Sequence, residues 1–157
     1  MSAAVFPAPE DTAVAVGLGC DRGTPLATLQ HALHQALAIA GVPLARVAAA
    51  ASISLKADEP GLLALAQALG WPPLVFYTPE ALAGVPVPNP SETVRRHTGT
   101  PSVSEAAALL AGAAVLGRAT PLPGQALLVE KFKHRGADGR NATVSIARCD
   151  RFLFPQP

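Results

Sequence analysis

The sequence is poor in the residue types that mark several large classes of protein. Its 157 residues include only seven aromatic side chains, two cysteines and three lysines, and 12 basic residues nearly balance 11 acidic ones. The charge balance excludes a polybasic nucleic-acid-binding surface, and so few aromatics argue against a platform on which bases stack. Two cysteines far apart in sequence make neither a disulfide framework nor a four-ligand zinc site. We therefore expect a reducing, cytoplasmic setting.

The sequence also shows no targeting or membrane-spanning segment. Residues 1–11 lack a basic start followed by an apolar run. The longest stretch without a charged residue or a histidine, residues 60–79, contains glycines and prolines that would break a membrane helix. Half of the residues are hydrophobic and 15% are charged, which is typical of a folded domain. We expect a flexible tail over 1–11, one domain over 12–149 and a C-terminal tail over 150–157.

Apolar segments alternate between strand-like and helix-like patterns along the chain. The expected strands lie within residues 13–18, 47–55, 74–77, 126–132 and 142–148. The last two are joined by a glycine-containing loop and are predicted to form an antiparallel hairpin. This order predicts an α/β fold, a three-layer α/β/α architecture with a mixed, mostly parallel sheet and a C-terminal antiparallel hairpin.

Four polar residues mark where helices are expected to begin. Thr24, Asp58, Ser91 and Ser102 are predicted N-caps, and Ser102 with Glu105 has the spacing of a capping box. The helices after Thr24, Asp58 and Ser102 are expected to run to Gly41, Gly70 and Gly112. These starts follow expected strands, and in open α/β sheets ligands bind at the carboxyl ends of the strands. The backbone N–H groups of the helix starts could bind an anion there, although four ordinary caps explain the pattern equally well.

Positive charge gathers in the last part of the chain. Residues 118–151 hold seven basic and three acidic residues, a net +4, whereas residues 1–117 hold five and eight, a net −3. Lys131 and Lys133 are two positions apart on an expected strand and would share one face. They could hold a carboxylate or a phosphate, but a solvated or lysine-protected strand edge is the commoner explanation of such a pair.

Other sequence signals for chemistry are weak. The glycines at 17, 19 and 23 miss the G-x-G-x-x-G spacing by one residue, so no nucleotide cofactor is predicted. Cys20 stands near a helix start and could have a stabilised thiolate, although a small residue in a tight turn is the commoner role. His97 and His134 have no second ligand at metal-binding spacing, so no metal is predicted.

Four motifs in order resemble the CobE and CbiG C-terminal domain family of cobalamin biosynthesis: GLGCDRGT (17–24), LKADEPGL (55–62), VPNPSE (87–92) and GTPSVSEA (99–106). The resemblance extends over about residues 13–148 and includes Lys131 and Lys133. Asp21 departs from the pattern, because a basic residue is more usual beside the arginine of the first motif.

This resemblance implies work on a precorrin, a tetrapyrrole with acetate and propionate side chains. Such a ligand needs cations, N–H donors and a broad apolar cleft. Asp58 and Glu59 do not fit simple anion binding, and would instead cap a helix, contact amides or transfer protons. The expected binding residues are Gly19, Cys20, Arg22, Gly23, Thr24, Lys56, Asp58, Glu59, Asn89, Ser91, Thr100, Ser102, Lys131 and Lys133.

The resemblance leaves three functions open. The first is binding of a precorrin intermediate, to protect it or to pass it between pathway enzymes. The second is hydrolysis or cleavage of a precorrin lactone with release of acetaldehyde, as associated with CbiG, in which Cys20, Asp58 or Glu59 would act. The third is a non-catalytic interaction module whose apolar tail (Phe152, Leu153 and Phe154) docks on another cobalamin-biosynthesis enzyme. The sequence shows no convincing pair of nucleophile and base, which places the second below the first.

Overall fold

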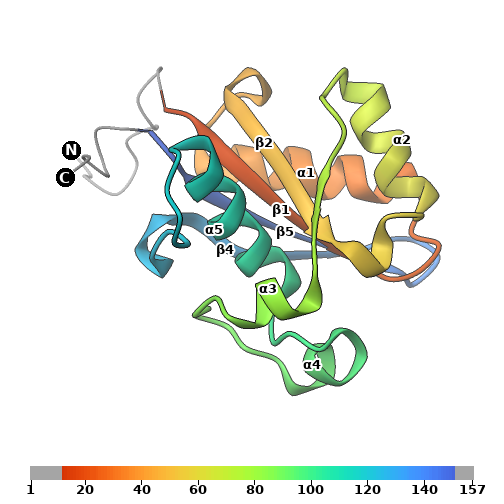
Figure 1. Ribbon diagram of the computed structural model, residues 1–157. Helices are drawn as coiled ribbons and strands as arrows, with labels where there is room; N and C mark the ends of the chain where they lie inside the picture. Colours follow the sequence, from red (N-terminus) through yellow and green to blue (C-terminus); the bar gives the residue numbers. More distant parts are fainter. Residues whose placement is uncertain (1–11, 151–157) are drawn as a thin grey trace, which may run out of the picture.

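The computed structural model describes residues 12–150, in which strands and helices alternate as far as α3 (Pro79–Ala83) and are followed by two more helices and two strands (Figure 1). The strands are β1 (Val14–Cys20), β2 (Val47–Ile53), β3 (Val75–Tyr77), β4 (Leu127–Arg135) and β5 (Asn141–Arg148). The α-helices are α1 (Leu26–Ala40), α2 (Pro60–Leu69), α3 (Pro79–Ala83), α4 (Glu92–Thr98) and α5 (Val103–Val115). No helix in this part of the chain is long and apolar enough to cross a membrane. The predicted tail over 1–11 and the apolar residues 152–154 lie outside the described residues.

The five strands form one mixed sheet in the order β3-β2-β1-β5-β4. β1, β2 and β3 pair in parallel, whereas β5 is antiparallel to both β1 and β4. β4 therefore runs in the same direction as β1, and four of the five strands point one way. This confirms the predicted mixed, mostly parallel sheet with a C-terminal antiparallel hairpin.

Helices cover both faces of the sheet. α1 and α2 pack on one face, α3 and α5 lie over the other, and α4 lies beyond α3 (Figure 1). Side chains of β1 alternate between the two layers, because successive strand residues point to opposite faces. Val14, Val16 and Leu18 belong to the core under α1 and α2, whereas Ala15 belongs to the core under α5.

The α5 face of β1 carries small residues, which lets the helix approach the strand backbone. A Cβ atom on Gly17 would lie 1.8 Å from the Ser104 carbonyl oxygen and 2.7 Å from the Ala108 nitrogen. α5 meets this surface with buried alanines, among them Ala107, Ala108 and Ala111. The backbones of β1 and α5 are therefore so close that position 17 has no room for a side chain. This contact fixes where α5 begins over the sheet.

Two of the predicted N-cap positions, Thr24 and Asp58, are wrong, and two, Ser91 and Ser102, are confirmed. The first hydrogen bonds of α1 reach the Pro25 carbonyl, so Pro25 is the N-cap and the Thr24 hydroxyl instead donates to the Asp21 carbonyl at 2.7 Å. The N-cap of α2 is Glu59 rather than Asp58, because Pro60 takes the first helical position. The Ser91 hydroxyl does cap α4, accepting from the Val94 N–H.

The predicted capping box at the start of α5 is also wrong. Ser102 is the N-cap residue, but its side chain makes no capping hydrogen bond. The Glu105 carboxylate accepts from Asn89 in the preceding loop instead of reaching back to the Ser102 N–H. The helix also continues past Gly112, which lies against Leu122, and ends at Val115.

The close approach of α5 predicts that Gly17→Ala lowers the free energy of unfolding by about 3 kcal/mol, because the added methyl group forces the helix and strand backbones apart. Urea denaturation followed by circular dichroism measures this change.

Gly19→Ala is the matched control, since it is on the same strand and the same face. Its Cβ would lie no closer than 3.8 Å to any neighbouring atom, so we expect a change within about 1 kcal/mol. Equal stabilities of the two variants would contradict the packing described.

Candidate functional site

A cleft of about 570 Å³ opens at the carboxyl ends of β1 and β2, against β4, β5, helix α4 and the first residues of α5. This is the edge of the sheet where the sequence places a ligand, and where the chain order reverses across β1. Seven of the predicted binding residues line it: Gly19, Cys20, Arg22, Lys56, Ser91, Lys131 and Lys133.

The other predicted residues are not part of the cleft lining. They are Gly23, Thr24, Asp58, Glu59, Asn89, Thr100 and Ser102. The hydroxyl groups of Thr100 and Ser102 are buried without a hydrogen-bond partner among the residues that the structure describes. Gly23, Thr24, Asp58, Glu59 and Asn89 hold neighbouring segments together through contacts described below.

Sequence reasoning missed much of the remaining cleft wall. The additional lining residues are Asp21, Ile53, Thr93, Val94, His97, Thr98, Val103, Ser104, Asn141 and Thr143. Most of them belong to α4, the start of α5 and the start of β5. Beyond Glu92, the last residue of the motif at 87–92, the charged helix α4 carries no motif that points to a site. The period of the β5 strand pattern could have indicated that Asn141 and Thr143 share one face.

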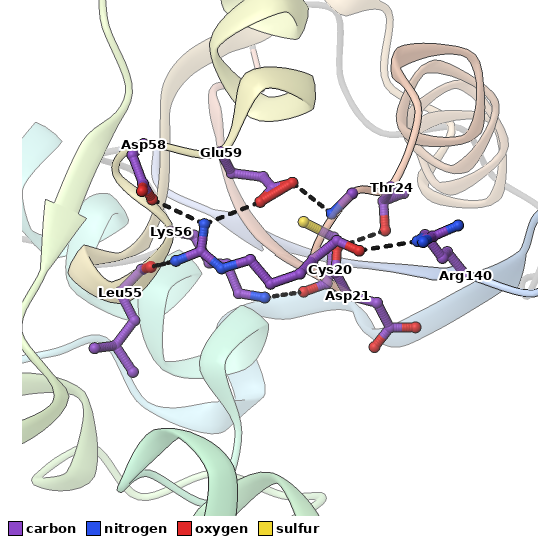
Figure 2. A network of polar contacts seen from close by, with 10 residues as sticks. Cys20, Asp21, Thr24, Leu55, Lys56, Asp58, Glu59 and Arg140 are labelled. Carbon is purple, nitrogen blue, oxygen red and sulfur yellow. Dashed lines mark hydrogen bonds and ion pairs between the residues drawn. The ribbon is translucent and has the colours of Figure 1, made fainter.

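Arg22 is held by contacts between the loop after β1 and the segment after β2. Figure 2 labels the three residues that accept from it, Leu55, Asp58 and Glu59. The Arg22 guanidinium group donates to Asp58 Oδ1 at 2.8 Å, to Glu59 Oε2 at 3.1 Å and to the Leu55 carbonyl. Arg22 also holds the pKa of the Asp58 carboxyl below its ordinary value, mainly through this hydrogen bond. Two carboxylates thus face one guanidinium group, and Arg22 is not a free cation.

Glu59 is the buried member of this network, with 2% of its side chain exposed. Its Oε1 accepts from the Gly23 backbone N–H at 2.7 Å while Oε2 faces Arg22. Asp58 is 81% exposed, so its ion pair with Arg22 is screened by solvent. Glu59 therefore fixes the loop after β1 to the start of α2. Of the roles considered for it from the sequence, it takes the cap position of α2 and the contact with an amide.

The three lysines of the chain all line the cleft. Lys56 donates to the Cys20 carbonyl at 2.6 Å, and Lys131 donates to the Asn89 carbonyl at 3.2 Å. The side chain of Lys133 makes no hydrogen bond or ion pair within residues 12–150. None of these ammonium groups is paired with a carboxylate there, so each has N–H groups left for a ligand.

Asp21, the departure from the family pattern, ties the first loop to the start of β5. Its Oδ2 accepts from the backbone N–H of Asn141 at 2.8 Å and from the side-chain amide of Asn141 at 3.1 Å. Arg140 adds a bond from Nε to the Arg22 carbonyl at 2.9 Å. The acidic residue in the first motif therefore has a structural partner on the C-terminal hairpin.

Asn89 lies behind the cleft, between α5 and β4. Its side-chain amide donates to Glu105 Oε2 at 2.7 Å and to Glu130 Oε1 at 3.0 Å, and its backbone N–H donates to Glu105 Oε1 at 3.2 Å. The third motif is thereby joined to the fourth, since Glu105 belongs to GTPSVSEA. Asn89 is positioned to support the cleft wall.

Cys20 does not have the properties of an activated nucleophile. Burial raises the pKa of its thiol to about 11, and the nearby Lys56 only partly opposes this effect. Its side chain is therefore a thiol at neutral pH, although it lines the cleft. Asp58 and Glu59, the other groups considered for catalysis, are engaged with Arg22.

Among residues 12–150, no group of three or more histidine, cysteine, aspartate or glutamate side chains could hold a metal ion.

The start of α5 brings a partial positive charge to the cleft. No side chain caps its first N–H groups, and Val103 and Ser104 of this turn line the cleft. The partial positive charge at this end favours a carboxylate or another anion.

Comparison with known proteins points to one family. Residues 14–147 match the family model described as Cobalamin synthesis G C-terminus. A cobalt-precorrin-5A hydrolase of Priestia megaterium is 40% identical over 97 residues, which cover 62% of this chain and 26% of the hydrolase. The protein CobE of a Sinorhizobium species is 42% identical over 98 residues, which cover 60% of this chain and 62% of that protein.

Solved structures agree with this match. The crystal structure of CobE, a protein from the cobalamin biosynthetic pathway, has a TM-score of 0.71 at 36% identity and covers 92% of this chain and 96% of that one. The cobalamin biosynthesis protein chiG from Agrobacterium tumefaciens has a TM-score of 0.53 at 27% identity and covers 84% of this chain and 96% of that one.

The raised pKa of Cys20 predicts slow alkylation. At pH 7.5 a thiol of pKa about 11 carries about 100-fold less thiolate than one at the ordinary value of 9.0, so iodoacetamide should label folded Cys20 at least that much more slowly than the urea-unfolded chain. Peptide mass analysis separates Cys20 from Cys149. Rapid labelling of the folded protein that levels off below pH 8 would show an activated thiolate and return Cys20 to the list of nucleophiles.

Proposed function

Because this chain belongs to the family described as Cobalamin synthesis G C-terminus, we propose that it binds a precorrin intermediate of cobalamin biosynthesis in the cleft and protects it or hands it to pathway enzymes. The observation that carries this proposal is the placement of every lysine of the chain around a single cleft. Lys56 comes from the segment after β2, and Lys131 and Lys133 come from β4.

A precorrin is a polycarboxylate on a flat macrocycle, and the cleft offers a partner for each part. Three ammonium groups and the start of α5 supply positive charge for acetate and propionate groups. Ile53, Val94 and Val103 supply apolar wall for the macrocycle. The volume of about 570 Å³ lies within the range of about 300–1,000 Å³ common to ligand pockets.

The proposed binding set differs from the one expected from sequence. Arg22 is shared between two carboxylates, so it organises the loops and contributes less to ligand charge than the lysines do. Asn141 and Thr143 replace Thr100 and Ser102 as the polar groups at the cleft wall. Asp21 also lines the cleft, and its Oδ1 is an acceptor suited to an N–H group of the ligand.

Hydrolysis of a precorrin lactone is the second candidate function. It is favoured by the relative named cobalt-precorrin-5A hydrolase, which is 40% identical over the matched region. The protonated Cys20 thiol and the engagement of Asp58 and Glu59 with Arg22 speak against it, because neither provides a free nucleophile or base. Binding without turnover is therefore placed first.

Binding is tested by an oxygen-free visible-absorption titration of the protein with a lactone-bearing precorrin, followed by mass analysis of the ligand. Lys131→Ala and Lys133→Ala should each raise the dissociation constant about tenfold, because each removes a charged contact to a carboxylate. Added salt should weaken binding to the unmodified protein as well.

Arg46→Ala is the control, since it removes the same charge from the opposite end of the sheet, beside the start of β2. It should leave the dissociation constant unchanged. Saturable binding with unchanged ligand mass supports the proposal, whereas release of acetaldehyde would establish the hydrolase. Equal affinities of the unmodified protein and both lysine variants would place the ligand outside the cleft.

A further inference from the structure

Glu105 is a fully buried acid without a cationic partner. Its side chain is 0% exposed, and no lysine, arginine or histidine forms an ion pair with it in the described part of the chain. A carboxylate in such a place is costly unless hydrogen-bond donors satisfy it. Both of its oxygens are satisfied by one residue, Asn89, through the backbone N–H and the side-chain amide.

Asn89 connects this buried acid to a lysine of the cleft. The Asn89 carbonyl oxygen accepts from Lys131 Nζ at 3.2 Å. Pro88 and Pro90 flank Asn89, which restricts the backbone on both sides. With the N–H and the side chain both fixed on Glu105, the direction of the Asn89 carbonyl is fixed as well.

We propose that Glu105 is a positioning residue for the ligand, which acts through Asn89 to hold the Lys131 ammonium group at the cleft. This inference rests on the proposed function. A lysine side chain has four flexible carbon–carbon bonds, and ordering it on binding costs free energy. A carbonyl that holds the ammonium group beforehand removes part of that cost, as other forms of preorganisation do.

A comparison with Glu130 explains why the buried Glu105, rather than another nearby carboxylate, fixes the orientation of Asn89. Glu130 also accepts from the Asn89 side chain, at 3.0 Å, but it lies on the exposed side of β4 and contacts only the amide nitrogen. Glu105 alone holds both the backbone and the side chain of Asn89 from a rigid helix.

A double-mutant cycle tests this role with precorrin titrations of Glu105→Gln, Lys131→Ala and the variant with both changes. Glu105→Gln should weaken binding about fivefold in the unmodified background. It should have almost no effect once Lys131 is absent, because its influence passes through that side chain. Glu80→Gln, an exposed acid on α3, is the matched control and should bind as the unmodified protein does.

A second measurement needs no precorrin. Acetylation of surface lysines by an N-hydroxysuccinimide ester, read by peptide mass analysis, should be several-fold faster at Lys131 in Glu105→Gln than in the unmodified protein. Lys133 has no partner in the described residues and serves as the internal reference, so its rate should not change. Asn89→Ala keeps the buried acid, lies in an exposed loop and should raise the rate at Lys131 in the same way.

The outcomes separate this inference from the proposed function. If Lys131→Ala weakens binding but Glu105→Gln does so equally with and without Lys131, Glu105 does not act through the lysine and the inference is wrong while the function stands. If the unmodified protein binds no precorrin, the function fails, and the acetylation rates alone decide whether Glu105 positions Lys131. Unchanged rates at Lys131 in both Glu105→Gln and Asn89→Ala would overturn the positioning role.

Discussion

The contact between the backbones of α5 and β1 at Gly17 is the constraint on which the cleft depends. The Ser104 carbonyl lies where a Cβ atom of residue 17 would be, so the first turn of α5 is held directly over the carboxyl half of β1. That turn brings Val103 and Ser104 to the cleft and directs Glu105 into the protein behind it. A larger residue at position 17 would move the helix, the cleft wall and the buried acid together.

Under the proposed function, charge around the cleft is divided between structure and binding. Arg22 is surrounded by Asp58, Glu59 and a carbonyl, so its charge serves to connect the loops after β1 and β2. The lysines are bonded at most to neutral carbonyl oxygens and keep their charge available to an anionic ligand. This division explains why a chain with almost no net charge can present a cationic site.

The fold was largely predictable because its signals are local. Apolar runs located every strand within a few residues, and the hairpin and the mostly parallel sheet followed from their order. The caps at Thr24 and Asp58 and the capping-box hydrogen bonds of Ser102 and Glu105 were mispredicted because tertiary partners compete for these residues: Asp58 pairs with Arg22, and the Glu105 carboxylate accepts from Asn89. Helix propensity considers an isolated helix, whereas contacts with segments distant in sequence determine where these side chains lie.

The candidate site was predictable only in part for the same reason. The strand period brought Lys131 and Lys133 together, and the family motifs pointed to the loops after β1 and β2. A motif residue either lines the cleft or supports it from behind, and three-dimensional contacts decide which. Lys56 and Ser91 line the cleft, whereas Glu59 and Asn89, from the same two motifs, make contacts behind it. α4 was missed because its residues after Glu92 match no motif, although Thr93 and His97 line the cleft.

The most direct measurement of the central claim is a map of backbone amide shifts by ¹⁵N nuclear magnetic resonance as a precorrin is added to the protein. The largest changes should fall on Gly19, Val103, Ser104 and Thr143, which line the cleft, and spread to neighbours of the three lysines. The smaller apolar groove beside Trp71 and Val75, at the far edge of the sheet, should remain unchanged. Shifts centred on that groove, or none at saturating ligand, would contradict the account.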